Sequence, residues 1–542
     1  MKAMTLEEVV TALEGTADRS LPVGTVSRVT IDSRAVSPGD LFVAVRGLQF
    51  DGHDFVGEAF ARGAMAAVVR DDYHLPRMDY SAVRPGAGSV VPVEDRPGHG
   101  AGGSGQGVDR RPLTGSEVGG YASPAMLIRV DDPVQALGRL ARYYRRSVIE
   151  GSVAVVAVTG SNGKTTTKAM IAHVLGGRYK GRASIKSYNN AIGVPLTLLS
   201  TEPPDEFVVC EVGTNAPGEI AALARLIEPE VAVLTGIAEV HLEGLGSLEG
   251  VAAEKLSLLA ALRPDGFAVV NVDPELLRWS LEHDRQYMRI KRVTFGEWSG
   301  ADLRLTSLRH VAGASGTAAG LEFTVNDRFE YQLGIPGRHN AFNALAAIGV
   351  ARRFGMDHEE IAARLATFEL PPMRLQGERL GKLTLINDAY NANPASVQAA
   401  MEVLVSMPAA GRRVMILGDM RELGAAAADR HRAVAERLAA SGVDLVIAVG
   451  EHSKLVSRTV QQASGGRVRV HAYASTALAR RRLVSHLEPT DTVLVKGSRL
   501  LALEQLVEVI RGWASSPPER KPAGKKKVAA KRSVSRGRVR GK

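Results

Sequence analysis

The chain from Val153 to Thr166 joins an apolar, β-branched run to a turn that contains two glycines and ends in a lysine and two threonines. Gly160 and Gly163 lack a Cβ atom, so the turn can close tightly and direct its backbone N–H groups inward. A helix that starts near Lys164 adds the positive end of its dipole to those groups. The pattern therefore predicts a buried strand, a phosphate-binding loop and a helix in direct succession.

Such a loop indicates a nucleoside triphosphate. Lys164 would neutralise the β- and γ-phosphates, and the Thr165 hydroxyl would hold a Mg²⁺ ion that bridges them. The two glycines lie two residues closer together than in the common G-x-x-x-x-G-K-[ST] pattern, so a generic NTPase fits imperfectly. The alternative is a glycine-rich turn with no ligand, which the combination of strand, loop, lysine and hydroxyls disfavours.

Length and composition suit a protein of several domains without a membrane span. The 542 residues are 45% hydrophobic and 23% charged, which is typical of about three or four domains with ample cores. No apolar run reaches the length of a bilayer-spanning helix, and the start MKAMTLEEVV is amphipathic and unlike a signal peptide. The single Cys210 excludes an intramolecular disulfide. We therefore expect a cytoplasmic protein.

The net charge of +10 comes from one end of the chain. Residues 516–542 hold eleven Lys and Arg against the single acid Glu519, so residues 1–515 are balanced in charge. The Pro, Gly, Ser and Lys content of this basic tail predicts disorder. The tail could contact polyanions such as RNA or anionic lipid nonspecifically, or it could be a dispensable solvated segment. We expect no specific nucleic-acid partner.

Alternating strand and helix patterns predict an α/β fold with three domains. We expect a small N-terminal domain over residues 1–150, a central parallel-sheet domain over residues 151–370 and a Rossmann-like C-terminal domain over residues 371–515. Glycine-rich segments between about residues 74 and 124 predict a flexible insertion in the first domain. Strands of the central domain are expected at 153–158, 207–212, 231–237 and 267–273.

Polar residues follow several of these strands, where open α/β sheets bind their ligands. They are Glu211, His241, Asn271 and Asp273. A single polar residue at a strand end more often has a structural role. Several such residues beside a phosphate loop favour a ligand-binding site. In the third domain, Asp388 and Tyr390 come just after an apolar strand and could face a cleft; an Asx-type turn is the equal alternative.

Taken together, several segments resemble the Mur ligase family of peptidoglycan precursor synthesis, and within it the MurF type. The resemblance spans residues 26 to about 505. It is carried by IDSRAVSPGDLFVAVRGLQFDGHDF (31–55), TGSNGKTTTK (159–168), EVGTNAPGEI (211–220), HLEGLGS (241–247), IPGRHNAFNALAA (335–347), NDAYNANPAS (387–396), LGDMRELG (417–424) and VKGSR (495–499). The loop TGSNGKTT marks the wider superfamily, which includes folylpolyglutamate synthase, whereas DAYNANP and HLEGLGS favour the MurF type.

The resemblance implies an ATP-dependent amide ligase whose N-terminal domain binds a UDP-sugar and whose central domain binds ATP. It implies that D-alanyl-D-alanine is joined to the tripeptide of UDP-N-acetylmuramoyl-tripeptide through an acyl phosphate, with two Mg²⁺ ions and a carbamylated Lys255. Lys164, Glu211, His241 and Lys255 would be catalytic, and the metal ligands would be Thr165, Glu211, His241 and Lys255.

The resemblance also assigns binding residues. Those for ATP are Gly160, Ser161, Asn162, Gly163, Lys164, Thr165, Thr166, His339, Asn340, Asn343, Arg374 and Asp388. Those for the substrates are Ser33, Arg34, Asp51 and His53 for the UDP-sugar, and Tyr390 and Asn391 for the dipeptide.

Two departures from the family pattern are local. Asn387 precedes Asp388 where relatives often have a second acid, and Ser257 stands where many have a glutamate after the motif lysine. Two other functions stay open. One is another Mur or folylpolyglutamate-type ligase, and the other is a nucleotide-dependent protein whose basic tail binds polyanions.

Overall fold

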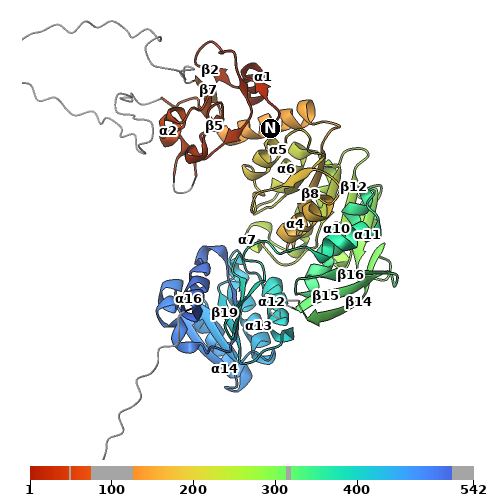
Figure 1. Cartoon of the computed structure of the whole chain (residues 1–542), viewed down its shortest axis with the longest axis vertical. Helices are drawn as coiled ribbons and strands as arrows, with labels where there is room; N and C mark the ends of the chain where they lie inside the picture. The colour runs from red at the N-terminus through yellow and green to blue at the C-terminus, as the bar shows by residue number, and fades with distance from the viewer. Residues whose placement is uncertain (48–49, 75–125, 313–318, 516–542) are drawn as a thin grey trace, which may run out of the picture.

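The structure is a computed structural model that describes residues 1–47, 50–74, 126–312 and 319–515. The described residues form three α/β domains, as the sequence predicts. Figure 1 shows them along a crescent, with the N-terminal domain (red to orange) at one end, the central domain (yellow to green) in the middle and the C-terminal domain (blue) at the other end. The predicted insertion and the basic tail lie outside the described residues. Among the described residues, no helix is both long and apolar enough to cross a bilayer.

The N-terminal domain is built on a sheet with strand order β2-β7-β6-β5-β4, parallel from β7 to β4. Asp132 caps α3 by accepting hydrogen bonds from the N–H groups of Val134 and Gln135, and Pro133 fits its first turn. The elements are β1 (Met4–Thr5), α1 (Leu6–Leu13), β2 (Thr16–Ala17), β3 (Thr25–Val26), β4 (Val29–Thr30), β5 (Leu41–Val43), α2 (Val56–Ala61), β6 (Ala66–Arg70), β7 (Met126–Val130) and α3 (Pro133–Tyr143).

The central domain contains a sheet with strand order β16-β15-β14-β13-β12-β11-β8-β10-β9. Pairing is parallel from β9 to β14 and antiparallel from β14 to β16. The strands are β8 (Ala154–Thr159), β9 (Gly181–Ala183), β10 (Phe207–Glu211), β11 (Val231–Leu234), β12 (Phe267–Asn271), β13 (Arg292–Gly296), β14 (Leu303–Ala312), β15 (Ala319–Val325) and β16 (Phe329–Leu333). The helices are α4 (Lys164–Leu175), α5 (Gly193–Leu199), α6 (Glu219–Ile227), α7 (Leu242–Leu245), α8 (Leu248–Leu256), α9 (Glu275–His283), α10 (Arg338–Arg353) and α11 (His358–Ala366).

The two faces of the central sheet bury different cores. Helices α4, α10 and α11 pack on one face, where side chains such as Val156, Val158 and Leu345 are buried. The other face packs against α5 and α6, which pack in turn against α3, so this core continues into the N-terminal domain. Strand β8 lies inside the sheet, between β11 and β10, and carries the phosphate loop at its carboxyl end, where open α/β sheets bind their ligands.

The C-terminal domain has a sheet with strand order β17-β18-β22-β19-β20-β21, parallel except for β17. Its strands are β17 (Gln376–Leu380), β18 (Leu383–Asp388), β19 (Arg413–Gly418), β20 (Leu445–Val449), β21 (Arg469–Tyr473) and β22 (Thr492–Lys496). Its helices are α12 (Pro394–Ser406), α13 (Ala427–Ala440), α14 (Ser453–Ser464), α15 (Thr476–Arg482) and α16 (Glu504–Ser515). The carboxyl ends of β18 and β22 meet side by side, which brings Asp388 next to Lys496.

Candidate functional site

The phosphate loop joins β8 to α4 through two backbone conformations that favour glycine. Gly160 has φ 149° and Gly163 has φ 82°, conformations that L side chains rarely adopt. The hydroxyl of Thr235 donates to the carbonyl of Asn162 at 2.6 Å and fixes the middle of the loop. Lys164 Nζ donates back to the carbonyl of Gly160 at 2.6 Å, and burial lowers the pKa of this lysine. The lysine therefore lies over the loop, where phosphate oxygens would replace the carbonyl as its partner.

Gly160→Ala is expected to raise KM for ATP and to lower the thermal midpoint. A Cβ at this position would overlap the Thr235 hydroxyl, and the backbone strain alone costs about 1–3 kcal/mol. Gly151→Ala is the matched control, because Gly151 also has a positive φ, 72°, but open space around its Cβ position. The control should lower the thermal midpoint without changing KM, measured by steady-state kinetics. Equal KM values in the two variants would contradict this account of the loop.

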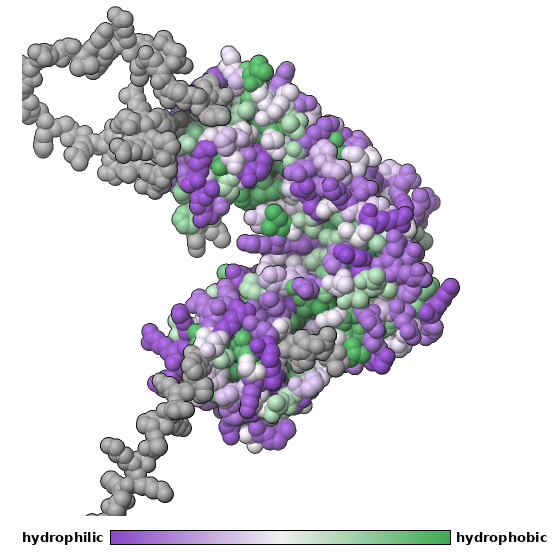
Figure 2. Space-filling model, in the orientation of Figure 1, coloured by the Kyte–Doolittle hydropathy of each residue, from purple (hydrophilic) through white to green (hydrophobic). Residues whose placement is uncertain are grey.

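A cavity of about 620 Å³ opens beside the loop, between the central and C-terminal domains. On the face drawn in Figure 2, the molecule is deeply recessed between its N-terminal and C-terminal ends. The cavity is lined by these predicted site residues: Ser161, Asn162, Gly163, Lys164, Thr165, Glu211, His241, Arg374, Tyr390 and Asn391. The structure therefore brings together most of the predicted phosphate, metal and dipeptide residues, from segments far apart in the chain.

Glu211 ends strand β10 and is almost fully buried, with 1% of its surface exposed. Its Oε1 atom accepts a hydrogen bond from Asn189 at 3.0 Å. Its Oε2 atom lies 3.3 Å from Lys168 Nζ but makes no aligned hydrogen bond. Lys168 also donates to the carbonyl of Ser184 at 2.9 Å. Sequence reasoning missed Lys168 as a partner of Glu211, although it lies one helical turn after Lys164 on α4.

The C-terminal domain reaches His241 through Glu422. His241 caps α7 in a left-handed conformation, and its Nδ1 atom lies 2.6 Å from Glu422 Oε2, although the two atoms are not aligned as a hydrogen bond. The contact with His241 lowers the pKa of Glu422. An ion pair across the same boundary joins Arg430 to Glu239 at 2.7 Å. Sequence reasoning missed Glu422, which lines the same cavity as His241.

Lys255 lies on α8 with 1% of its surface exposed and lines neither large cavity. Its amine makes no hydrogen bond or ion pair with any residue that the structure describes. Burial lowers the pKa of Lys255 well below its usual value, and the positive charge of Lys164 lowers it further. Both effects favour the neutral form of this amine more than in an exposed lysine.

A second cavity, of about 400 Å³, lies on the other side of the loop. The predicted residues that line it are Ser161, Asn162, Gly163, Thr166, His339, Asn340, Asn343, Arg374 and Asp388. Asn343 donates to Asn340 at 3.0 Å and accepts from Thr167 at 3.1 Å, which ties α10 to α4. Burial lowers the pKa of His339 to about 4, so its ring is neutral at pH 7. Asn271 and Asp273 also line this cavity.

The C-terminal domain contributes side chains to both cavities. Arg374 donates to the Thr165 hydroxyl at 3.1 Å, and its guanidinium lies 4.3 Å from the centre of the Tyr390 ring. Lys496 pairs with Asp388 at 2.5 Å, and Asp388 also accepts from the N–H of Leu375. Asp388 lines the second cavity and Tyr390 the first. Lys496 was not anticipated, and it lines both cavities.

The predicted UDP-sugar residues lie in the N-terminal domain and line neither cavity. Ser33 donates to Glu58 at 2.8 Å, and Arg34 pairs with Asp32 at 2.8 Å. Asp51 accepts from the N–H of His53 at 3.0 Å and lies 2.6 Å from its ring. These contacts stabilise two turns at one end of the crescent.

The donor set of the larger cavity fits Mg²⁺. The cation prefers oxygen ligands and often keeps several waters. Thr165 offers a hydroxyl, and Glu211 offers a buried carboxylate oxygen with no hydrogen bond of its own. His241 and the unmodified Lys255 are weaker ligands for Mg²⁺, because both offer nitrogen atoms. His241 offers an imidazole nitrogen and Lys255 an amine.

Comparisons with known proteins extend this likeness to nearly the whole chain. Family models match for the Mur ligase family catalytic domain over residues 25–98, the Mur ligase middle domain over 158–351 and the Mur ligase glutamate ligase domain over 373–499. The chain is 35% identical to the UDP-N-acetylmuramoyl-tripeptide--D-alanyl-D-alanine ligase of Escherichia coli, over 90% of this chain and 94% of that protein. It is 30% identical to the enzyme of the same name from Bacillus subtilis, over 93% and 97%.

Solved structures give the same result. A crystal structure of MurF from Acinetobacter baumannii superposes with a TM-score of 0.74 at 26% identity, over 94% of this chain and 99% of that one. MurF from Thermotoga maritima in complex with ADP superposes with a TM-score of 0.67 at 25% identity, over 90% and 97%. The chain belongs to the Mur ligase family and, within it, to the MurF group.

Proposed function

We propose that this chain is the ATP-dependent ligase that joins D-alanyl-D-alanine to the tripeptide of UDP-N-acetylmuramoyl-tripeptide in peptidoglycan precursor synthesis. Relatives of that name match most of the chain. The observation that carries the proposal is a single cavity lined by the phosphate loop, by Glu211 and His241 and by Tyr390 and Asn391 of another domain. Such a cavity can hold a triphosphate beside an acceptor.

The reaction needs no side-chain nucleophile. A carboxylate oxygen of the tripeptide attacks the γ-phosphorus of ATP, which gives an acyl phosphate and ADP. The amine of D-alanyl-D-alanine then attacks the acyl carbon, an amide forms, and phosphate leaves as the amine loses a proton. Phosphoryl transfer of this kind depends on positioning and on neutralising charge.

The polar residues of the cavity would both position the reacting groups and neutralise their charge. Lys164 would donate to the transferring phosphoryl group, and Arg374, already bonded to Thr165, would bring a second positive charge from the C-terminal domain. Thr165, Glu211 and His241 would hold two Mg²⁺ ions, which neutralise phosphate charge. Lys255 would act as a carbamate, formed when its neutral amine takes up CO₂ and releases a proton.

The remaining roles follow from position. His339, Asn340 and Asn343 would line the adenine pocket in the second cavity, with Asp388 near the nucleotide. Ser33, Arg34, Asp51 and His53 would bind the UDP-sugar from the N-terminal domain. These residues lie outside both cavities, so the three domains must close around the substrates before the amine can reach the acyl phosphate.

The domain boundaries and the cellular setting are part of the proposal. The three units would be residues 1–150, 151–370 and 371–515, followed by the basic tail at 516–542, which would contact polyanions only nonspecifically. A cytoplasmic location suits substrates that are soluble nucleotides and peptides.

An acceptor panel tests the function. Purified protein should release ADP from ATP only when UDP-N-acetylmuramoyl-tripeptide and D-alanyl-D-alanine are both present, measured by a coupled ADP assay. Turnover with the preceding UDP-linked dipeptide and an amino acid, or with a folate and glutamate, would favour another ligase of the superfamily. Polyanion binding without acceptor-dependent turnover would favour a binding protein.

A further inference from the structure

We propose that Glu422 of the C-terminal domain is a positioning residue for His241 of the central domain. In this account the imidazole takes its working orientation only when the two domains are docked. The inference rests on the proposed function, because it uses the role of His241 at the magnesium site.

The contact between the two residues crosses the domain boundary at the cavity. Glu422 Oε2 lies 2.6 Å from His241 Nδ1, close enough for a hydrogen bond although not aligned as one, and both residues line the cavity that contains Lys164 and Glu211. Both have a positive φ, 65° for Glu422 and 54° for His241. Such conformations are uncommon in non-glycine residues and persist where the surrounding structure fixes them. The two backbones are thus held so that the side chains meet.

A carboxylate beside Nδ1 determines which imidazole nitrogen is free. It favours the tautomer with the proton on Nδ1, and it leaves the lone pair of Nε2 for a cation. Histidines that bind metals commonly have such a carboxylate on their other nitrogen, and its loss weakens metal binding. Glu422 therefore supplies from one domain the partner that a metal-binding histidine of the other domain needs.

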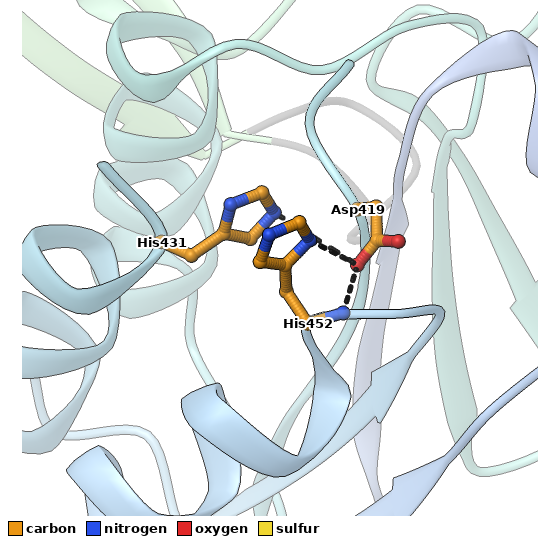
Figure 3. Close-up of side chains that lie close together, drawn as sticks. All are labelled: Asp419, His431 and His452. Atoms are coloured by element: carbon orange, nitrogen blue, oxygen red, sulfur yellow. Dashed lines mark hydrogen bonds and ion pairs between the residues drawn. The ribbon is translucent and has the colours of Figure 1, made fainter. Parts of the chain in front are cut away.

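The segment that carries Glu422 is anchored at its start by Asp419, His431 and His452, drawn in Figure 3. The two rings are stacked, with centres 4.1 Å apart and planes 8° from parallel. His431 accepts from the N–H of Met420 at 3.0 Å, and its other ring nitrogen lies 2.7 Å from the carbonyl of Ala427. Both nitrogens of His431 are thus engaged, and two parallel rings cannot both hold one ion in their planes. The cluster anchors a loop rather than a metal.

The carboxylate of Asp419 completes the anchor. It accepts hydrogen bonds from the N–H groups of Glu451 at 2.7 Å and His452 at 3.1 Å, at the start of α14. The backbone two and three residues before Glu422 is therefore tied to α13 and α14, so Glu422 moves with the body of the C-terminal domain.

The ion pair between Arg430 and Glu239 supplies a matched control. Arg430 meets Glu239 at 2.7 Å, two residues before His241, and so crosses the same boundary to a carboxylate instead of the imidazole. Its loss would weaken docking by one contact, as loss of Glu422 does, and would leave the Nδ1 partner in place.

A measurement of metal affinity separates loss of the imidazole's partner from loss of a contact between the domains. Mn²⁺ replaces Mg²⁺ as the probe, and its binding to full-length protein with ADP is followed by electron paramagnetic resonance. Glu422→Ala should raise the Kd for Mn²⁺ about 10- to 100-fold, the usual effect of losing such a partner. Glu422→Gln should fall between this variant and the wild type. Arg430→Ala should change the Kd less than about threefold, since an exposed ion pair contributes little.

Wild-type affinity in Glu422→Ala, in protein of unchanged thermal midpoint, would overturn the proposal. An equal loss in Arg430→Ala would also overturn it, because docking alone would then explain the effect. Acceptor-dependent turnover by the wild type is scored separately, so an intact ligase with unchanged Mn²⁺ affinity in Glu422→Ala refutes the positioning role and leaves the proposed function standing.

Discussion

Lys164→Ala is expected to lower kcat/KM for ligation by about 100-fold or more, which corresponds to about 3 kcal/mol of transition-state stabilisation. The lysine lies over the loop and donates to the Gly160 and Ser161 carbonyls. In the proposed reaction its contacts to the phosphoryl group would strengthen as charge builds on the transferring oxygens. Because the side chain is partly buried, water replaces it poorly, and the loss appears in the chemical step.

Two variants separate charge from structure. Lys164→Arg keeps the positive charge but replaces a point charge by a planar fork, so it should recover only part of kcat/KM. Lys291→Ala removes an exposed lysine of the same domain, which pairs with Asp265, and should leave kcat/KM unchanged. Near-wild-type kcat/KM in Lys164→Ala, at an unchanged thermal midpoint, would refute the role of this residue.

The fold follows from local patterns to a large extent. The strands expected at 207–212 and 267–273 appear as β10 and β12, since continuous β-branched runs suit strands buried on both faces of a parallel sheet. The strand expected at 231–237 ends earlier, at Leu234, because Gly236 has φ 139° and its carbonyl instead accepts from Ser161 of the phosphate loop. The hydrogen bond to the loop after β8 therefore ends its neighbouring strand early.

The site residues that the sequence analysis did not predict belong to pairs that are far apart in the chain. Lys496 and Asp388 are 108 residues apart and meet because β18 and β22 are neighbours in the sheet. Glu422 meets His241 only because two domains dock. No spacing in the sequence encodes such pairings, since they depend on strand order and domain arrangement. Lys168 is different. The sequence shows that it lies one helical turn after Lys164, but it does not show that the side chain points toward Glu211.

The second large effect is expected on substitution of Lys255, and the acidic residues near this lysine explain why. An ordinary helix lysine would pair with Glu249 or Glu254. Glu254 instead accepts hydrogen bonds from the N–H groups of Gly218 and Ile220, both at 2.7 Å, and so holds the start of α6. Its charge favours the ammonium form of Lys255, but burial and the charge of Lys164 outweigh it and lower the lysine pKa. A buried amine without a partner is costly as a cation and is available as a base.

Carbamylation would resolve this cost and would give the lysine an anionic group. An ammonium would repel Mg²⁺, whereas a carbamate offers it oxygen ligands. Carbon dioxide reacts only with the neutral amine, so the lowered pKa of Lys255 favours the modification at neutral pH. As the pH falls through that pKa, the amine protonates and the carbamate is lost, so activity should fall on the acid side.

Lys255→Ala is therefore expected to lose most ligase activity and to regain part of it when acetate or another short-chain carboxylic acid is added. The carboxylate can occupy the space left by the carbamate and supply the same oxygen ligands. Steady-state ADP release with and without the acid measures the rescue, and Lys291→Ala, tested in parallel, should show no response to it. ¹³C-labelled CO₂ should give a carbamate resonance in the wild type that the Lys255→Ala variant lacks. Full activity of Lys255→Ala without any acid would refute the carbamate, because nothing else in that variant could supply the missing ligand.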